Sequence, residues 1–244
     1  MVLTLTAWLS LCRPCSPTCV VAITNRKTGE IVLAADSLVR HRYTPSESKC
    51  KIHVVTTDCT VAMVGMYKQQ FPAFDLLALS QFACRGPGDL KQRADTFLST
   101  ALPRVTEAVN YSQNTDPDSL KQQYEGKPII EVLFAGAYKH KPAIFVRGAV
   151  LENGVLKPEA VSVPSERVHL FAGVNGHIRA YIQNHPGWEA DGGVPAALRL
   201  IKIEVEAHPD IVGPPISVGT VNSNGEFHWV QRGECEEPAH QFLR

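Results

Sequence analysis

The segment TCVVAITNRKTGEIVLAADS covers residues 18–37 and holds two apolar runs separated by a turn. The runs are residues 19–23 and 31–35, and the residues between them include Asn, Thr and Gly. This order is typical of a β-hairpin. Thr18 precedes the first run and Asp36 follows the second. We therefore expect a hydroxyl and a carboxylate at neighbouring strand ends, where a carboxylate can orient a nucleophile or its base.

The rest of the chain alternates between strand and helix patterns, without an internal repeat. The expected elements are a second hairpin at 51–55 and 60–64 that ends at Gly65, helices at 67–82 and 90–109 with a kink or break at Pro103, a polar loop at 112–127, strands at 129–138, 143–151 and 168–172, helices at 177–184 and 196–207, and strands at 216–221 and 226–231. Two antiparallel sheets stacked face to face, with a helix pair on each outer face, would bury all of the apolar faces. We therefore predict an α+β fold, an αββα four-layer sandwich.

The composition predicts a folded chain with a substantial core. The chain has 244 residues, of which 44% are hydrophobic, and this is enough for one large domain or two small ones. We favour a single domain at 18–232 with a polar tail at 233–244. The 24 basic and 24 acidic residues balance, which argues against a general nucleic-acid-binding surface.

The first residues, MVLTLTAWLSLC, are apolar, but the run is too short to span a bilayer and no basic residue precedes it. We expect no membrane partner. A removable pro-segment or an upstream start codon is favoured over a secretion signal. In either of these two cases residues 1–17 are dispensable to the fold.

The seven cysteines are odd in number and mostly scattered along the chain. This pattern favours reduced thiols and a cytoplasmic location over a disulfide framework. Cys12, Cys15 and Cys19 form a CxxCxxxC cluster, but a structural zinc ion needs a fourth ligand and no histidine follows at zinc-finger spacing. We therefore predict no metal and no cofactor.

Several motifs, in this order, resemble the proteasome β-subunit family. They are TCVVAI, EIVLAADS, KIHVV and TVAMVG, followed by weaker similarity in FAGVNGHIRAYI and HPDIVGPPISVGTVNSNG, so the resemblance covers about Thr18 to Gly225. VGPPI is similar to the bacterial, proteasome-related Anbu branch. The resemblance implies the fold of an N-terminal-nucleophile (Ntn) hydrolase. It also implies a threonine peptidase that acts on peptide or protein substrates within a homo-oligomeric ring and can take an unfoldase ATPase as a partner.

The resemblance assigns catalytic roles to five residues. Thr18 matches the nucleophile, Asp36 the acidic residue of the AADS motif, Lys51 the lysine of the KI motif, Gly65 the glycine whose N–H serves the oxyanion hole, and Asp210 a supporting aspartate. A free α-amino group has a pKa of about 8 and can take the proton of the Thr18 hydroxyl. Lys51 would lower the pKa of that amine or hydroxyl, and Asp36 would hold the lysine charged and oriented.

Some positions depart from the family pattern. Pro17 stands where the family cleaves after glycine, and its fixed φ restricts the geometry that self-cleavage requires. Residues 173–176 read GVNG in place of a serine-bearing GSG segment, with Asn175 as a partial substitute, and Gly213 stands where a later serine is expected. Cys19 is an alternative nucleophile if the register shifts by one residue, although packing as a small hydrophobe is favoured.

Three functions stay open on the sequence alone. The first is a threonine peptidase subunit of a proteasome-like ring. The second is an amide or ester hydrolase of the same fold that acts on small acyl substrates and needs no ring. The third is a catalytically silent scaffold subunit, in which Asp36 and Lys51 form an ordinary ion pair.

Overall fold

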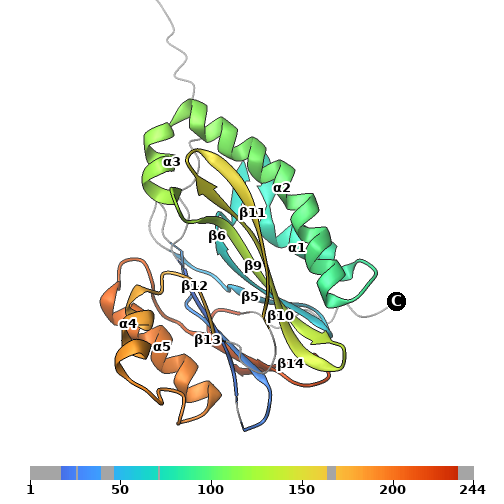
Figure 1. Cartoon of the computed structure of the whole chain (residues 1–244), viewed down its shortest axis with the longest axis vertical. Helices are drawn as coiled ribbons and strands as arrows, with labels where there is room; N and C mark the ends of the chain where they lie inside the picture. Colours follow the sequence, from blue (N-terminus) through green and yellow to red (C-terminus); the bar gives the residue numbers. More distant parts are fainter. Residues whose placement is uncertain (1–17, 26, 40–46, 71, 164–168, 236–244) are drawn as a thin grey trace, which may run out of the picture.

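The computed structural model describes residues 18–25, 27–39, 47–70, 72–163 and 169–235. Figure 1 shows α1 to α3 on one side of the strands and α4 and α5 on the other. The elements are, in chain order, β1 (Cys19–Thr24), β2 (Ile31–Ala35), β3 (Leu38–Val39), β4 (Glu47–Ser48), β5 (Ile52–Thr56), β6 (Cys59–Gly65), β7 (Lys68–Gln70), β8 (Ala73–Asp75), α1 (Leu76–Arg85), α2 (Leu90–Thr115), α3 (Pro117–Tyr124), β9 (Pro128–Tyr138), β10 (Lys141–Glu152), β11 (Val155–Val163), β12 (His169–Gly173), α4 (Gly176–Asn184), α5 (Gly193–Ala207), β13 (Ser217–Val221) and β14 (Phe227–Gln231).

Two five-stranded sheets contain the main strands. Sheet I has the order β12-β1-β2-β13-β14, and sheet II has the order β11-β10-β9-β6-β5. All neighbouring strands in both sheets are antiparallel. The hairpin expected from the first motif is the β1–β2 pair, with Val20 opposite Ala35. Because β12 pairs with the other side of β1, Cys19 at the start of β1 lies opposite Gly173 at the end of β12.

Sheets I and II face each other across one cluster of apolar side chains. Successive side chains of a strand point to opposite faces, so β1 contributes Val20 and Ala22 to this cluster and turns Val21 and Ile23 toward the helices. Every residue of β1 and β2 is buried. A strand that is buried on both faces is apolar throughout, which explains why these two segments do not alternate with polar residues.

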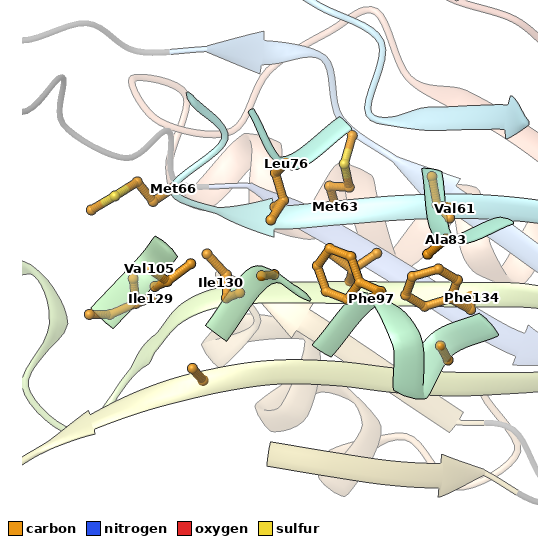
Figure 2. Packing of buried hydrophobic residues seen from close by; sticks show 14 of the residues in the cluster. Val61, Met63, Met66, Leu76, Ala83, Phe97, Val105, Ile129, Ile130 and Phe134 are labelled. Carbon is orange, nitrogen blue, oxygen red and sulfur yellow. The ribbon is translucent and has the colours of Figure 1, made fainter. Parts of the chain in front are cut away.

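Helices cover the outer face of each sheet. On sheet II, Phe97 of α2 packs against Phe134 of β9 with ring centroids 5.3 Å apart, and Figure 2 shows these rings among the other apolar side chains of the cluster. On sheet I, Ile178 of α4 and Leu200 of α5 pack against the outward side chains of β1 and β2. These apolar contacts hold helices against sheet I and sheet II on the faces that the sheets do not share.

The region around α1 differs from the expected helix at 67–82. Residues 68–70 and 73–75 pair as the short strands β7 and β8, and the helix begins only at Leu76. Asp75 caps this helix by accepting a hydrogen bond from the Ala78 N–H. A capping aspartate satisfies one of the unpaired N–H groups of the first turn, so it marks the true start of the helix.

The region 112–127 is not the polar loop that we expected. α2 continues through Pro103 to Thr115, without the expected break, because its apolar stripe on both sides of the proline is buried against sheet II. α3 then begins at Pro117, capped by Asp116. Proline is favoured at the first position of a helix, where its missing N–H costs nothing. The strand β11 was also not predicted, because most of its side chains are exposed and lack a buried apolar face.

Two disulfides contradict the prediction of reduced thiols. Cys50 pairs with Cys235, 185 residues later, and Cys59 pairs with Cys84, 25 residues later. Pairing depends on which cysteines the fold brings together, so it cannot be read from their spacing. Cys235 belongs to the expected polar tail, yet it is buried and ties that segment to the residue before Lys51. Cys12 and Cys15 lie outside the described residues.

In the part of the chain that the structure describes, no helix is both long and apolar enough to cross a membrane.

Candidate active site

Asp36, directly after β2, is the centre of a hydrogen-bond network. Its Oδ1 accepts from the Cys19 N–H at 2.9 Å and from Lys51 Nζ at 2.8 Å. Its Oδ2 accepts from the N–H groups of Leu38 and Gly213, each at 3.2 Å. One carboxylate therefore joins the start of β1, the chain after β2, the residue before β5 and the segment that leads to β13.

Lys51 is buried together with Asp36. Lys51 is 4% exposed and Asp36 is 0% exposed. Burial raises the pKa of Asp36 and lowers the pKa of Lys51, and the attraction between the two charges opposes both shifts. Lys51 Nζ also donates to Leu38 O at 2.7 Å. An ammonium group has three N–H donors, and the third finds no partner among the described residues.

Contacts on both sides hold the backbone of Thr18, the residue before β1. It is 3% exposed, and its carbonyl oxygen accepts from the Val174 N–H at 2.8 Å. The next residue, Cys19, is held by Asp36. On the other side Gly173 has a φ of +74°, and a Cβ at this position would overlap the Thr18 carbonyl oxygen. Only glycine combines this backbone conformation with so close an approach.

Gly65 ends β6 on the opposite sheet. Its φ is +94°, and a Cβ on it would overlap the carbonyl oxygen of Ile129. The preceding residue, Val64, has its Cγ1 atom 3.1 Å from the point that a Cβ on Gly173 would occupy. The end of β6 therefore approaches the place where Thr18 meets Gly173, so the two sheets meet at this end of the space between them.

Cys19, the alternative nucleophile, packs in the core between sheet I and the helices α4 and α5. It is free of disulfides and 0% exposed. Burial, together with the negative charges of Asp36 and Glu204, raises the pKa of its thiol well above the ordinary value. A thiol that stays protonated is a weak nucleophile.

Asp210 is not brought to this network. It lies exposed in the turn after α5. The atom of this segment that reaches Asp36 is the backbone N of Gly213, three residues later. A backbone donor carries no signature in the residue types, so this contact could not be predicted from the sequence.

Asn175 stabilises the turn at Gly173, which lies against the carbonyl oxygen of Thr18. Its Nδ2 donates to the carbonyl oxygens of Phe171, at 2.8 Å, and Gly173, at 3.1 Å. Its Oδ1 accepts from Arg179 Nε at 2.7 Å. Asn175 was expected from the sequence as a partial substitute for a missing serine, but Arg179 was not. The two side chains meet because Asn175 is the N-cap of α4 and Arg179 lies four residues later on the same side of the helix. In the described ranges, no group of three or more His, Cys, Asp or Glu side chains is arranged to hold a metal ion.

Comparison with known proteins shows a shared fold. No family model matches the chain, and no curated protein matches it either. Among solved structures it is similar to Anbu from Pseudomonas aeruginosa, solved as a helical assembly of the Anbu complex, with a TM-score of 0.58 and 15% identity over 89% of this chain and 88% of that chain. It is also similar to a Gly-1 mutant of Anbu from Hyphomicrobium sp. strain MC1, with a TM-score of 0.57 and 12% identity over 90% of this chain and 89% of that chain. At these identities the similarity establishes the fold, and the chain has the fold of the Anbu proteins.

Proposed function

We propose that this chain is a proteasome-type threonine hydrolase that cleaves peptide bonds through Thr18 as a subunit of an oligomeric ring. The fold shared with Anbu supports a four-layer Ntn-hydrolase domain at 18–232, and the assembly solved for the Pseudomonas protein supports oligomerisation. The observation that carries the proposal is the buried Asp36–Lys51 pair. A single hydrogen bond joins it to the residue that follows Thr18.

The chemistry begins once the bond between Pro17 and Thr18 is cut. The new α-amino group of Thr18 takes the hydroxyl proton, and Oγ attacks the carbonyl carbon of the substrate. The positive charge of Lys51, with its third N–H donor, lowers the pKa of the amine so that it is a base near neutral pH. Asp36 holds that lysine in place.

The tetrahedral intermediate carries a negative oxygen, which the N–H of Gly65 stabilises. One such donor contributes on the order of 3 kcal/mol in comparable sites. The protonated amine returns its proton to the leaving nitrogen, and the peptide bond breaks to leave an ester on Thr18. A water molecule, activated by the same amine, then hydrolyses the ester and restores the free hydroxyl.

The test is to find the N-terminus of the full-length protein and then to measure cleavage of a fluorogenic peptide. We expect a terminus at Thr18 by intact mass and N-terminal sequencing. Thr18→Ala should abolish hydrolysis, whereas Thr24→Ala, at the other end of the same strand, should keep it. An active Thr18→Ala protein would refute the proposal.

A silent scaffold subunit is the second candidate, and two observations favour it. Pro17 precedes Thr18, and Thr18 is itself buried. Both features oppose attack on this peptide bond. A silent subunit predicts that the chain keeps its N-terminal extension, forms oligomers by light scattering, and hydrolyses no peptide.

A further inference from the structure

Glu131 is a titratable side chain that the mechanism above does not use. It lies on β9, opposite Val64 of β6. Its neighbour Val132 packs under the helices, while Leu133 packs between the sheets. By the alternation of a strand, Glu131 shares the inward face with Leu133, so it points toward sheet I at the end where Thr18 lies.

Gly173 connects Glu131 with Thr18. The Glu131 carboxylate lies near the backbone N–H of Gly173, which favours the ionised form of the carboxylate. The opposite side of Gly173 lies against the carbonyl oxygen of Thr18, which Val174 holds at 2.8 Å. A side chain of sheet II therefore lies beside the backbone segment that contacts Thr18, the residue before β1.

The charged groups that act on Glu131 are Glu159 of β11 and Arg179 of α4. Its direct strand neighbours, Val64 on β6 and Gly148 on β10, carry no charge. Burial and the negative charge of Glu159 raise the pKa of Glu131 to about 7, although Arg179 and the Gly173 N–H oppose this shift. Glu131 is partly buried, so protons from solvent reach it.

We propose that Glu131 is a positioning residue whose ionised carboxylate holds Gly173, and through it Thr18, in the arrangement that hydrolysis requires. The inference rests on the proposed threonine hydrolase function. The GVNG segment carries no hydroxyl. Polar support for Thr18 on this side therefore comes from Glu131 and from Asn175, which binds both Gly173 and Arg179.

The pH dependence of kcat/KM tests the inference on the processed full-length protein. Two groups must lose a proton in the wild type, the Thr18 amine and Glu131, so the logarithm of kcat/KM should fall with a slope of about two below about pH 6. Glu131→Gln keeps the shape and an acceptor oxygen but cannot ionise. We expect its slope to be about one.

Substitutions at two residues near Glu131 should shift its pKa in opposite directions. Glu159→Gln removes a like charge, so the steep part of the profile should begin at a lower pH. Arg179→Gln removes an opposite charge, so it should begin at a higher pH. A merely structural role for Glu131 would produce neither shift.

A second measurement does not depend on activity. In ¹⁵N-labelled protein with Thr18→Ala, the amide signal of Gly173 should titrate with a midpoint near that of Glu131, and Glu131→Gln should remove this titration. If the logarithm of kcat/KM falls at low pH with the same slope in Glu131→Gln as in the wild type, the role of Glu131 is refuted and the hydrolase proposal stands. Absence of the amide titration would refute the role of Glu131 as well. An amide titration in a protein that hydrolyses nothing in any form would overturn the hydrolase proposal, and with it this role of Glu131.

Discussion

Replacing Asp36 by Asn should leave the Lys51 ammonium buried without its counter-charge. Lys51 is 4% exposed, so it cannot regain solvent without local unfolding. Removing one partner of a buried pair costs about 3–5 kcal/mol. The folded variant can avoid the buried charge by deprotonating Lys51, which at pH 7 costs about 5 kcal/mol for a group with an ordinary pKa of about 10.4. We therefore expect Asp36→Asn to lower the free energy of unfolding by about 3–5 kcal/mol at pH 7.

The sign of the pH dependence follows from the same argument. In Asp36→Asn the pKa of Lys51 is depressed in the folded state, so between that value and the ordinary pKa the unfolded chain binds one more proton. The free energy of unfolding then rises with pH, by about 1.4 kcal/mol per unit. The cost of the substitution should shrink accordingly between pH 7 and pH 9.

Urea unfolding at several pH values, followed by circular dichroism, measures this cost. The double variant Asp36→Asn, Lys51→Met removes both charges, so it should lose less than the sum of the single variants and show no added pH dependence. As a matched control, Glu152→Gln breaks the exposed pair with Lys157 and should cost less than about 1 kcal/mol. A cost for Asp36→Asn that does not change with pH, or strictly additive single variants, would refute the reasoning.

The remaining predictions concern the nucleophile, the turn and the disulfide. Thr18→Ala should abolish peptide hydrolysis while changing the free energy of unfolding by no more than about 1 kcal/mol, and a urea titration checks the second half of this statement. Gly173→Ala should cost about 3 kcal/mol or more, because it adds overlap with Thr18 to backbone strain, whereas Gly126→Ala, which has a φ of +70° and open space around it, should cost only about 1 kcal/mol. Cys235→Ser should cost about 2–4 kcal/mol by the same titration, and a reducing agent should lower the stability of the wild type by more than that of the variant, which keeps the Cys59–Cys84 disulfide.

Local pattern was enough to predict the elements that are most apolar. The β1–β2 hairpin was predicted almost to the residue, because two uninterrupted apolar runs flank a turn with glycine. β11 was missed because an edge strand with exposed side chains has no apolar face to detect. α3 was missed because its polar surface looks like a loop, and its cap, Asp116, is informative only together with Pro117.

Some residues of the candidate site were predicted from the sequence, and others were not. Thr18, Asp36 and Lys51 were chosen from the sequence, and in the structure Asp36 binds both Lys51 and the N–H of Cys19, the residue after Thr18. Asp210 was chosen as well, but a backbone N–H of the same segment makes the contact instead. Glu131 was not chosen, because a lone acidic residue in an apolar strand gives no sign of what faces it.

The sequence by itself determined the apolar strands and the residues whose chemistry suits a nucleophile and a charged pair. It did so because strand periodicity and residue type are local properties. Only the tertiary structure decided the contact between Gly213 and Asp36, 177 residues apart, and the disulfide between Cys50 and Cys235. It also decided that Glu131 of sheet II meets Gly173 of sheet I. These contacts depend on how two sheets pack against each other, and that packing is set by the whole apolar core rather than by any segment within it.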